Sequence, residues 1–169
     1  MKTTFRIVLI LMIILFTFGC QNDAQAKLEA ENIELVKKYF NAWNNLDIET
    51  IKTLYDENIY SFSRTFKNPE PKSYEETIET VLWNFEYFPD AKTEIINIVA
   101  DGNMVVSMCL WEATYIKDIE DLPSAKGQSV NFSFVNTIWI ENGKIVEEIE
   151  VANLLEFYNK IDMELKPKE

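Results

Sequence analysis

Apolar residues in the first half of the chain recur every three or four positions, the spacing of one helical face. The first such face consists of Ile33, Val36, Phe40 and Trp43. Asp47 then stands where it can cap a short second helix, and residues 59–63 have the composition of a short strand. Ser73 and Glu76 form a capping-box pattern in front of a third helix, whose apolar face consists of Ile78, Val81, Leu82 and Phe85. This part of the chain is therefore predicted to be mainly helical.

After residue 90 the chain changes to runs of β-branched and aromatic residues, which are typical of strands. The four runs cover residues 92–100, 104–116, 129–140 and 144–152. Residues 101–103 and 141–143 are hairpin signals, and a closing helix has Leu154, Leu155, Tyr158 and Ile161 on one side. Helices followed by an antiparallel meander predict an α+β fold, with the helices on one face of a curved antiparallel sheet and a short C-terminal helix.

The N-terminus has the pattern of an export signal. Lys2 and Arg6 precede an apolar run at residues 7–18, and Gly19 and Cys20 follow it. The run is too short to span a bilayer, which takes about 20 residues. A cysteine directly after a small residue resembles a bacterial lipoprotein signal, in which cleavage precedes a cysteine that carries lipid. We therefore predict a signal peptide at 1–19 and a location in the cell envelope, extracytoplasmic and anchored to a membrane through Cys20. A secreted protein or an uncleaved anchor are the alternatives.

Composition limits the partners. Hydrophobic residues make up 47% of the chain and aromatic residues 13%, enough for a full core. The formal net charge is −12, and loss of Lys2 and Arg6 with the leader makes the mature chain still more acidic. Such a surface repels phosphate backbones, so no nucleic acid partner is expected.

Composition also excludes several chemistries. The chain has no histidine, which removes Ser–His and Cys–His nucleophilic catalysis. Once Cys20 carries lipid, Cys109 is the one remaining thiol, so we expect a small buried residue there, no disulfide and no metal site. The four glycines cannot form a glycine-rich phosphate loop, and no cofactor is predicted. Carboxylate, tyrosine and amide chemistry remains.

The last strand carries the candidate acid. A period of two places Ile145, Glu147, Ile149, Val151 and Asn153 on one face. We expect that face to meet the helices, which would desolvate Glu147 and suit it to acid–base work. The alternative for Glu147 is a solvated or lysine-paired position at the rim. Asn153 can orient a ligand carbonyl or cap the last helix, and Tyr115 can place a hydroxyl donor at the mouth of a cavity.

The aromatic excess suggests the wall of an apolar pocket. The candidate ligand-binding residues are Trp43, Trp83, Phe88, Trp111, Phe132 and Phe134. For each of them the alternative is an ordinary place in the core. Trp139 falls on the opposite face of its strand from Phe132 and Phe134, where it can belong to an outer surface or to a homodimer contact.

Residues 33–163 resemble the SnoaL-like polyketide cyclase family within the nuclear transport factor 2-like superfamily. The matching stretches are VKKYFNAWNNLDIETIKTLYDENI, FPDAKTEIINIVADGNMVV and ENGKIVEEIEVANLLEFYNKI. The resemblance implies a cone-shaped sheet around the N-terminal helices, a pocket for an apolar ligand, and ring closure by an aspartate acid–base. The aspartate's position reads as Asn153, a common histidine reads as Tyr115, and a frequent arginine reads as Met108, so cyclase activity is not expected.

These observations divide the chain into a signal peptide at 1–19, a lipidated cysteine and polar tether at 20–31, a SnoaL-like domain at 32–163 and a polar tail at 164–169. The leading functional hypothesis is a membrane-anchored domain that binds a small apolar ligand without turning it over. One alternative is a cyclase- or isomerase-like enzyme with Glu147 as base, helped by Tyr115 or Asn153. Another is a dimeric structural or interaction protein whose pocket is filled by its own aromatic residues.

Overall fold

The computed structural model of the protein describes the backbone of residues 2–63 and 70–163 and the side chains of residues 23–61 and 70–163. The side chains of the predicted leader, including Cys20, and the predicted tail at 164–169 lie outside these described residues. The helices are α1 (Lys2–Asn44), α2 (Ile48–Leu54), α3 (Tyr74–Tyr87) and α4 (Leu154–Lys160). The strands are β1 (Tyr55–Ser63), β2 (Lys92–Asp101), β3 (Met104–Tyr115), β4 (Gln128–Glu141) and β5 (Lys144–Ala152).

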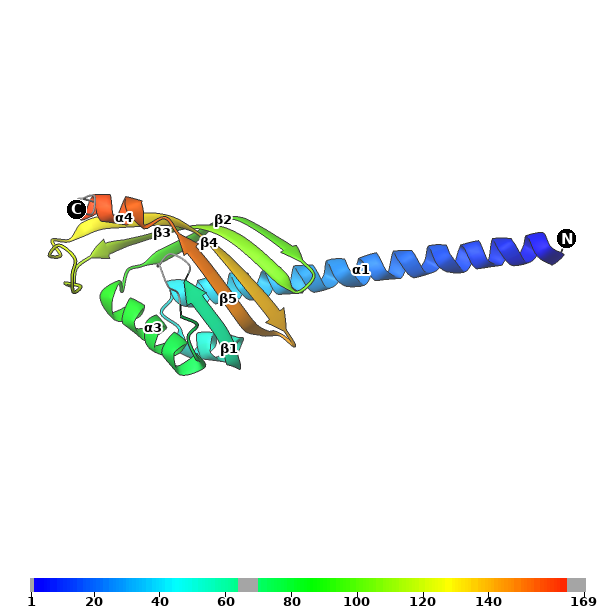
Figure 1. The fold of residues 1–169 in the computed structure, drawn as a ribbon, viewed down its shortest axis with the longest axis horizontal. Helices are drawn as coiled ribbons and strands as arrows, with labels where there is room; N and C mark the ends of the chain where they lie inside the picture. The colour runs from blue at the N-terminus through cyan, green and yellow to red at the C-terminus, as the bar shows by residue number, and fades with distance from the viewer. Residues whose placement is uncertain (1, 64–69, 164–169) are drawn as a thin grey trace.

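The five strands form one curved sheet in the order β1-β5-β4-β3-β2. β2 to β5 are the predicted antiparallel meander, whereas β1 pairs in parallel with β5, so the sheet is mixed. Figure 1 shows the C-terminal part of α1 and α2 inside the bend of the sheet and α3 beside them. The predicted α+β fold with helices on one face of a curved sheet is confirmed.

Local hydrogen bonds explain where α2 and α3 begin. The Asp47 carboxylate accepts a hydrogen bond from the backbone N–H of Thr50 and caps α2. At α3, Ser73 Oγ accepts from the Glu76 N–H, and the Glu76 carboxylate accepts from the Ser73 N–H. Both starts were predicted from the sequence.

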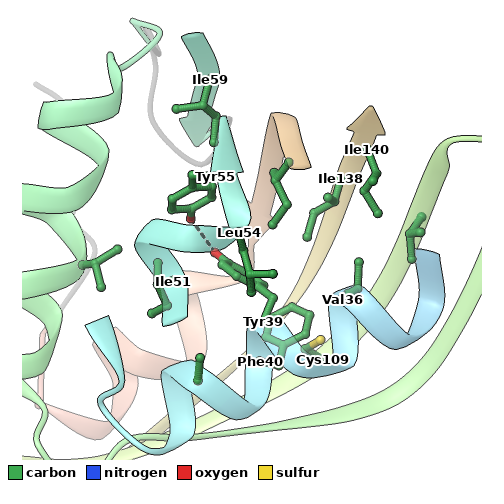
Figure 2. Packing of buried hydrophobic residues seen from close by; sticks show 14 of the residues in the cluster. Val36, Tyr39, Phe40, Ile51, Leu54, Tyr55, Ile59, Cys109, Ile138 and Ile140 are labelled. Atoms are coloured by element: carbon green, nitrogen blue, oxygen red, sulfur yellow. Dashed lines mark hydrogen bonds between the residues drawn. The ribbon is translucent and has the colours of Figure 1, made fainter. Parts of the chain in front are cut away.

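The main core lies between α1, α2 and the inner face of the sheet. Figure 2 shows Val36, Tyr39 and Phe40 of α1 beside Cys109 of β3 and Ile138 of β4. Cys109 is buried, as predicted, and forms no disulfide with a described residue. A second cluster under α4 contains Phe88, Ala113, Tyr115, Val130, Phe157 and Ile161.

The N-terminal part of α1 extends away from the domain (Figure 1). The helix meets the β2–β3 turn at Gly102, whose N–H donates to Glu29 and whose carbonyl accepts from Asn32. At its C-terminal end Asn44 exchanges two hydrogen bonds with the backbone of Thr93. Within the part of the chain whose side chains are described, no helix is both long and apolar enough to cross a membrane.

Candidate functional site

A β-bulge decides which acids of β5 face the helices. Ile145 pairs with Ile140 but Glu147 pairs with Trp139, so Val146 is an extra residue on β5. The extra residue exchanges the two faces beyond it. The prediction that Glu147 faces the helices is therefore wrong. It lies on the outer face, and Glu148 lies on the inner face with only 8% of its surface exposed.

Glu148 is held by three donors inside the cone. Its Oε1 accepts from the Tyr39 hydroxyl at 2.8 Å and from Asn136 Nδ2 at 2.6 Å. Its Oε2 accepts from the Tyr55 hydroxyl at 2.8 Å, and the two tyrosine oxygens are themselves 2.8 Å apart. Figure 2 shows these two tyrosines pointing toward each other from α1 and β1. We call Tyr39, Tyr55, Asn136 and Glu148 the polar cluster.

The polar cluster shifts the pKa values of its own tyrosines and of a neighbouring acid. Burial, followed by the negative charge of Glu148, raises the pKa of Tyr39 and of Tyr55 well above the ordinary value. Glu150, the next inward residue of β5, is partly buried. Burial and then the charge of Glu148 raise the pKa of Glu150 to about 7, against a smaller opposing effect of Lys72. A carboxyl with such a pKa exchanges its proton near neutrality.

A narrow cleft opens between α1, α3 and the start of β2. It is lined by Trp43, Asn44, Leu46, Asn84, Phe85, Phe88, Ala91, Thr93 and Trp111. The lining is mainly apolar, with two amides and one hydroxyl. The cleft measures about 250 Å³ with its solvent-open part included, and its enclosed space is about 10 Å³, which is room for roughly one water.

Trp43 joins the cleft to the polar cluster. Its ring contacts Tyr39 edge to face at 6.2 Å on one side and Phe85 at 5.5 Å on the other. Its Nε1 is buried, and among the described residues its polar neighbour is the Tyr39 hydroxyl, whose pKa it lowers slightly without a hydrogen bond of ordinary geometry. The indole therefore contacts both the cleft and Tyr39, one of the residues that bind Glu148.

The predicted ligand-binding aromatics divide into two groups. Trp43, Phe88 and Trp111 line the cleft. Trp83 is exposed on α3 and stacks on Tyr87, while Phe132 stacks on Trp111 behind the cleft and Phe134 packs on Phe40 in the core. For Phe132 and Phe134 the core alternative describes the structure better, because neither lines the cleft.

Tyr115 and Asn153 do not join Glu147 in one site. Tyr115 is fully buried, and its hydroxyl donates to the carbonyl of Pro123 and accepts from the N–H of Ile119. The expected hydroxyl at the cavity mouth is thus an anchor for the loop after β3. Asn153 is exposed at the start of α4, where its side chain accepts from the Leu155 N–H. The three residues predicted to act together therefore lie in different places: Glu147 on the outer face of the sheet, Tyr115 in the core and Asn153 at the start of α4.

The outer face of the sheet carries the remaining residues singled out in the sequence. Met108, where the resemblance places an arginine, is 48% exposed and pairs there with Val135. Trp139 is on the same face and pairs with Met104 and Glu147. Among the described residues, no group of three or more acidic or cysteine side chains is arranged to hold a metal ion.

A curved sheet wrapped around helices defines a class of small cone-shaped α+β domains. Residues 33–161 match the model of the SnoaL-like polyketide cyclase family. Because this match covers most of the chain, the protein belongs to that family. No functionally curated protein matches the sequence.

Solved structures share the fold at low sequence identity. AclR from Streptomyces galilaeus is 21% identical with a TM-score of 0.73, and the match covers 83% of this chain and 91% of AclR. A phenazine biosynthesis-related protein from Pseudomonas aeruginosa is 18% identical (TM-score 0.70, covering 87% and 95%). An LEH-like epoxide hydrolase from M. tuberculosis is 15% identical (TM-score 0.63, covering 79% and 90%). At these identities the likeness establishes the fold alone.

Proposed function

We propose that this protein is a lipid-anchored, extracytoplasmic SnoaL-like domain that binds a small apolar ligand and does not carry out the family's ring closure. The observation that carries the proposal is the cleft, whose walls include Trp43, Phe88 and Trp111 and whose few polar groups can orient a ligand. The names of two similar structures, an epoxide hydrolase and a phenazine biosynthesis-related protein, support a small organic ligand.

Ligand entry requires the cleft to widen. Its enclosed space of about 10 Å³ is far below the several hundred Å³ of an ordinary ligand pocket. Asn84 and Phe85, which α3 contributes to the lining, would have to change rotamer to enlarge it, and this would break the contact of Asn84 with the Thr80 carbonyl or of Phe85 with Trp43. The ligand therefore binds with a change of side-chain rotamers, and its affinity is reduced by the free energy of that change.

The loss of cyclase activity is inferred from Asn153. At neutral pH a side-chain amide acts as a hydrogen-bond donor and acceptor and not as a general acid or base. Its oxygen is already used to cap α4, and the side chain is exposed. Replacement of this residue by aspartate would restore an acid without moving it into the cone, so Asn153→Asp is expected to cap α4 and to create no ring-closing activity.

The anchor is inferred from residues 1–20, and the extension of α1 away from the domain supports it (Figure 1). With Cys20 at the bilayer, α1 would hold the cleft away from the lipid surface. Growth of producing cells with an alkyne analogue of palmitate tests this step. Label is expected on the wild-type chain and absent from Cys20→Ser, whereas equal labelling of both would refute lipidation at Cys20.

A variant that fills the cleft tests ligand binding. Ala91 lines the cleft, so Ala91→Phe would place a ring in it, and Val135→Phe on the exposed outer face is the matched control. The probe is a neutral naphthylamine dye whose fluorescence rises in apolar surroundings. Ala91→Phe is expected to weaken binding at least about tenfold, or ~1.4 kcal/mol, and Val135→Phe to leave it unchanged. Equal effects of the two substitutions would place the dye outside the cleft.

A second candidate function is self-association through the outer sheet face. Met108, Val135 and Val151 are neighbours in the strand register, and each is between 39% and 49% exposed. A row of exposed apolar side chains can be buried by contact with the same row on a second copy of the chain. Sedimentation of the full-length chain in density-matched detergent tests it. A dimer that Val135→Lys dissociates supports the contact, and a wild-type monomer at all concentrations refutes it.

A further inference from the structure

Asn136 has one unsatisfied atom in the centre of the cone. Its side chain is 2% exposed, and Nδ2 donates to Glu148 Oε1 at 2.6 Å. That bond fixes the orientation of the amide, because only the nitrogen can donate to a carboxylate. The other atom, Oδ1, is buried with no donor among the described residues. A buried acceptor without a partner is costly, so a donor is expected nearby.

Glu150 is the group placed to supply that donor. It pairs directly with Asn136 in the β4–β5 register. The side chains of directly opposed residues lie on the same face, with Cβ atoms roughly 4.5–5.5 Å apart. An ionised carboxylate only accepts hydrogen bonds, whereas a protonated carboxyl can donate one. Protonation of Glu150 would therefore satisfy Asn136 Oδ1.

The charges around Glu150 favour its neutral form. Burial has the largest effect on its pKa, and the carboxylate of Glu148 on the same strand acts in the same direction. The charge of Lys72, near β1, lowers the pKa of Glu150, although Lys72 Nζ also donates a hydrogen bond to Thr80. On β3, burial raises the pKa of the Cys109 thiol, a hydrogen bond with Ser107 lowers it by less, and the charge of Glu150 adds a smaller increase. The tyrosines of the polar cluster stay neutral.

We propose that Glu150 holds an exchangeable proton that it donates to Asn136 Oδ1, and that the Asn136 amide links this proton to the carboxylate of Glu148. The two acids of β5 and the amide of β4 then form one proton-binding site inside the cone. The inference is independent of ligand binding at the cleft, because it rests on groups that do not line it.

Nuclear magnetic resonance of the full-length chain with labelled glutamate carboxyls tests the site. One glutamate signal is expected to titrate with a midpoint near 7, to disappear in Glu150→Gln and to persist in Glu147→Gln, the outer-face control. Glu148→Gln removes the like charge and is expected to lower the midpoint by about one unit. A midpoint for Glu150 near its ordinary 4.5 would overturn the proposal.

The side-chain amide of Asn136 gives a second readout in the unmodified protein, which keeps the test valid if a variant fails to fold. Its NH₂ signals are expected to shift with the same midpoint as Glu150, because the amide contacts both acids. Amide signals that stay constant through that pH range would show that Asn136 Oδ1 is satisfied by another group, such as a water. That result would also overturn the proposal.

Discussion

Removal of the Tyr55 hydroxyl is expected to destabilise the domain because it leaves one oxygen of Glu148 unpaired. Among the described residues, Tyr55 supplies the donor to Oε2 at 2.8 Å, while Tyr39 and Asn136 both bind Oε1. A hydrogen bond to a charged group contributes about 1.5–3 kcal/mol. Tyr55→Phe keeps the ring in its place in the core, so no large cavity adds to this cost. We expect the free energy of unfolding to fall by about 2 kcal/mol.

Urea denaturation followed by far-ultraviolet circular dichroism measures this loss. If the unfolding free energy of the variant depends on urea concentration with the same slope as that of wild type, the two-state comparison holds. Tyr87→Phe is the matched control, since Tyr87 stacks on Trp83 outside the cluster and its substitution is expected to cost less than about 0.5 kcal/mol. Tyr39→Phe combined with Tyr55→Phe should cost less than the two single losses together, because both hydroxyls serve one carboxylate. Equal losses for Tyr55→Phe and Tyr87→Phe would refute the reasoning.

Three further predictions concern Glu150, Asn153 and Cys109. The folded pKa of Glu150 is raised from 4.5 to about 7, so its contribution to stability is complete below about pH 4.5 and is lost as the pH rises to 7, by up to about 3 kcal/mol. Glu150→Gln should flatten the pH profile of urea midpoints over that range, and a profile like that of wild type would contradict this. Asn153→Ala should cost about 1 kcal/mol through loss of the α4 cap, whereas Asn153→Asp should cost almost nothing in the same assay. Burial raises the pKa of the Cys109 thiol, so a thiol reagent should modify it slowly in the folded protein and fast in urea, and rapid labelling of the folded chain would refute its burial.

The sequence predicts the elements of this fold because their signals are local. The capping box at Ser73 and the turns around Gly102 and Gly143 each lie within four residues. Which side chains of β5 point toward the helices could not be predicted in the same way. The extra residue Val146 carries no special side chain, and without it the alternation from Ile145 points Glu147 inward.

The polar cluster could not be predicted because its parts come together only through the fold. Tyr39 and Tyr55 are 109 and 93 residues from Glu148 along the chain, and each sits in an ordinary apolar pattern. A buried glutamate has no local mark that separates it from the two other glutamates of the strand. The absence of histidine did limit the candidate chemistry to carboxylates, tyrosines and amides, which are the groups of the polar cluster.

Mass spectrometry of the natively purified full-length protein tests the binding proposal most directly. We predict that a recurring small apolar molecule accompanies the wild-type chain and Val135→Phe, and is lost from Ala91→Phe, whose added ring occupies the cleft. Preparations of all three proteins that carry only the same membrane lipids, or no small molecule at all, would contradict a ligand-binding role for the cleft.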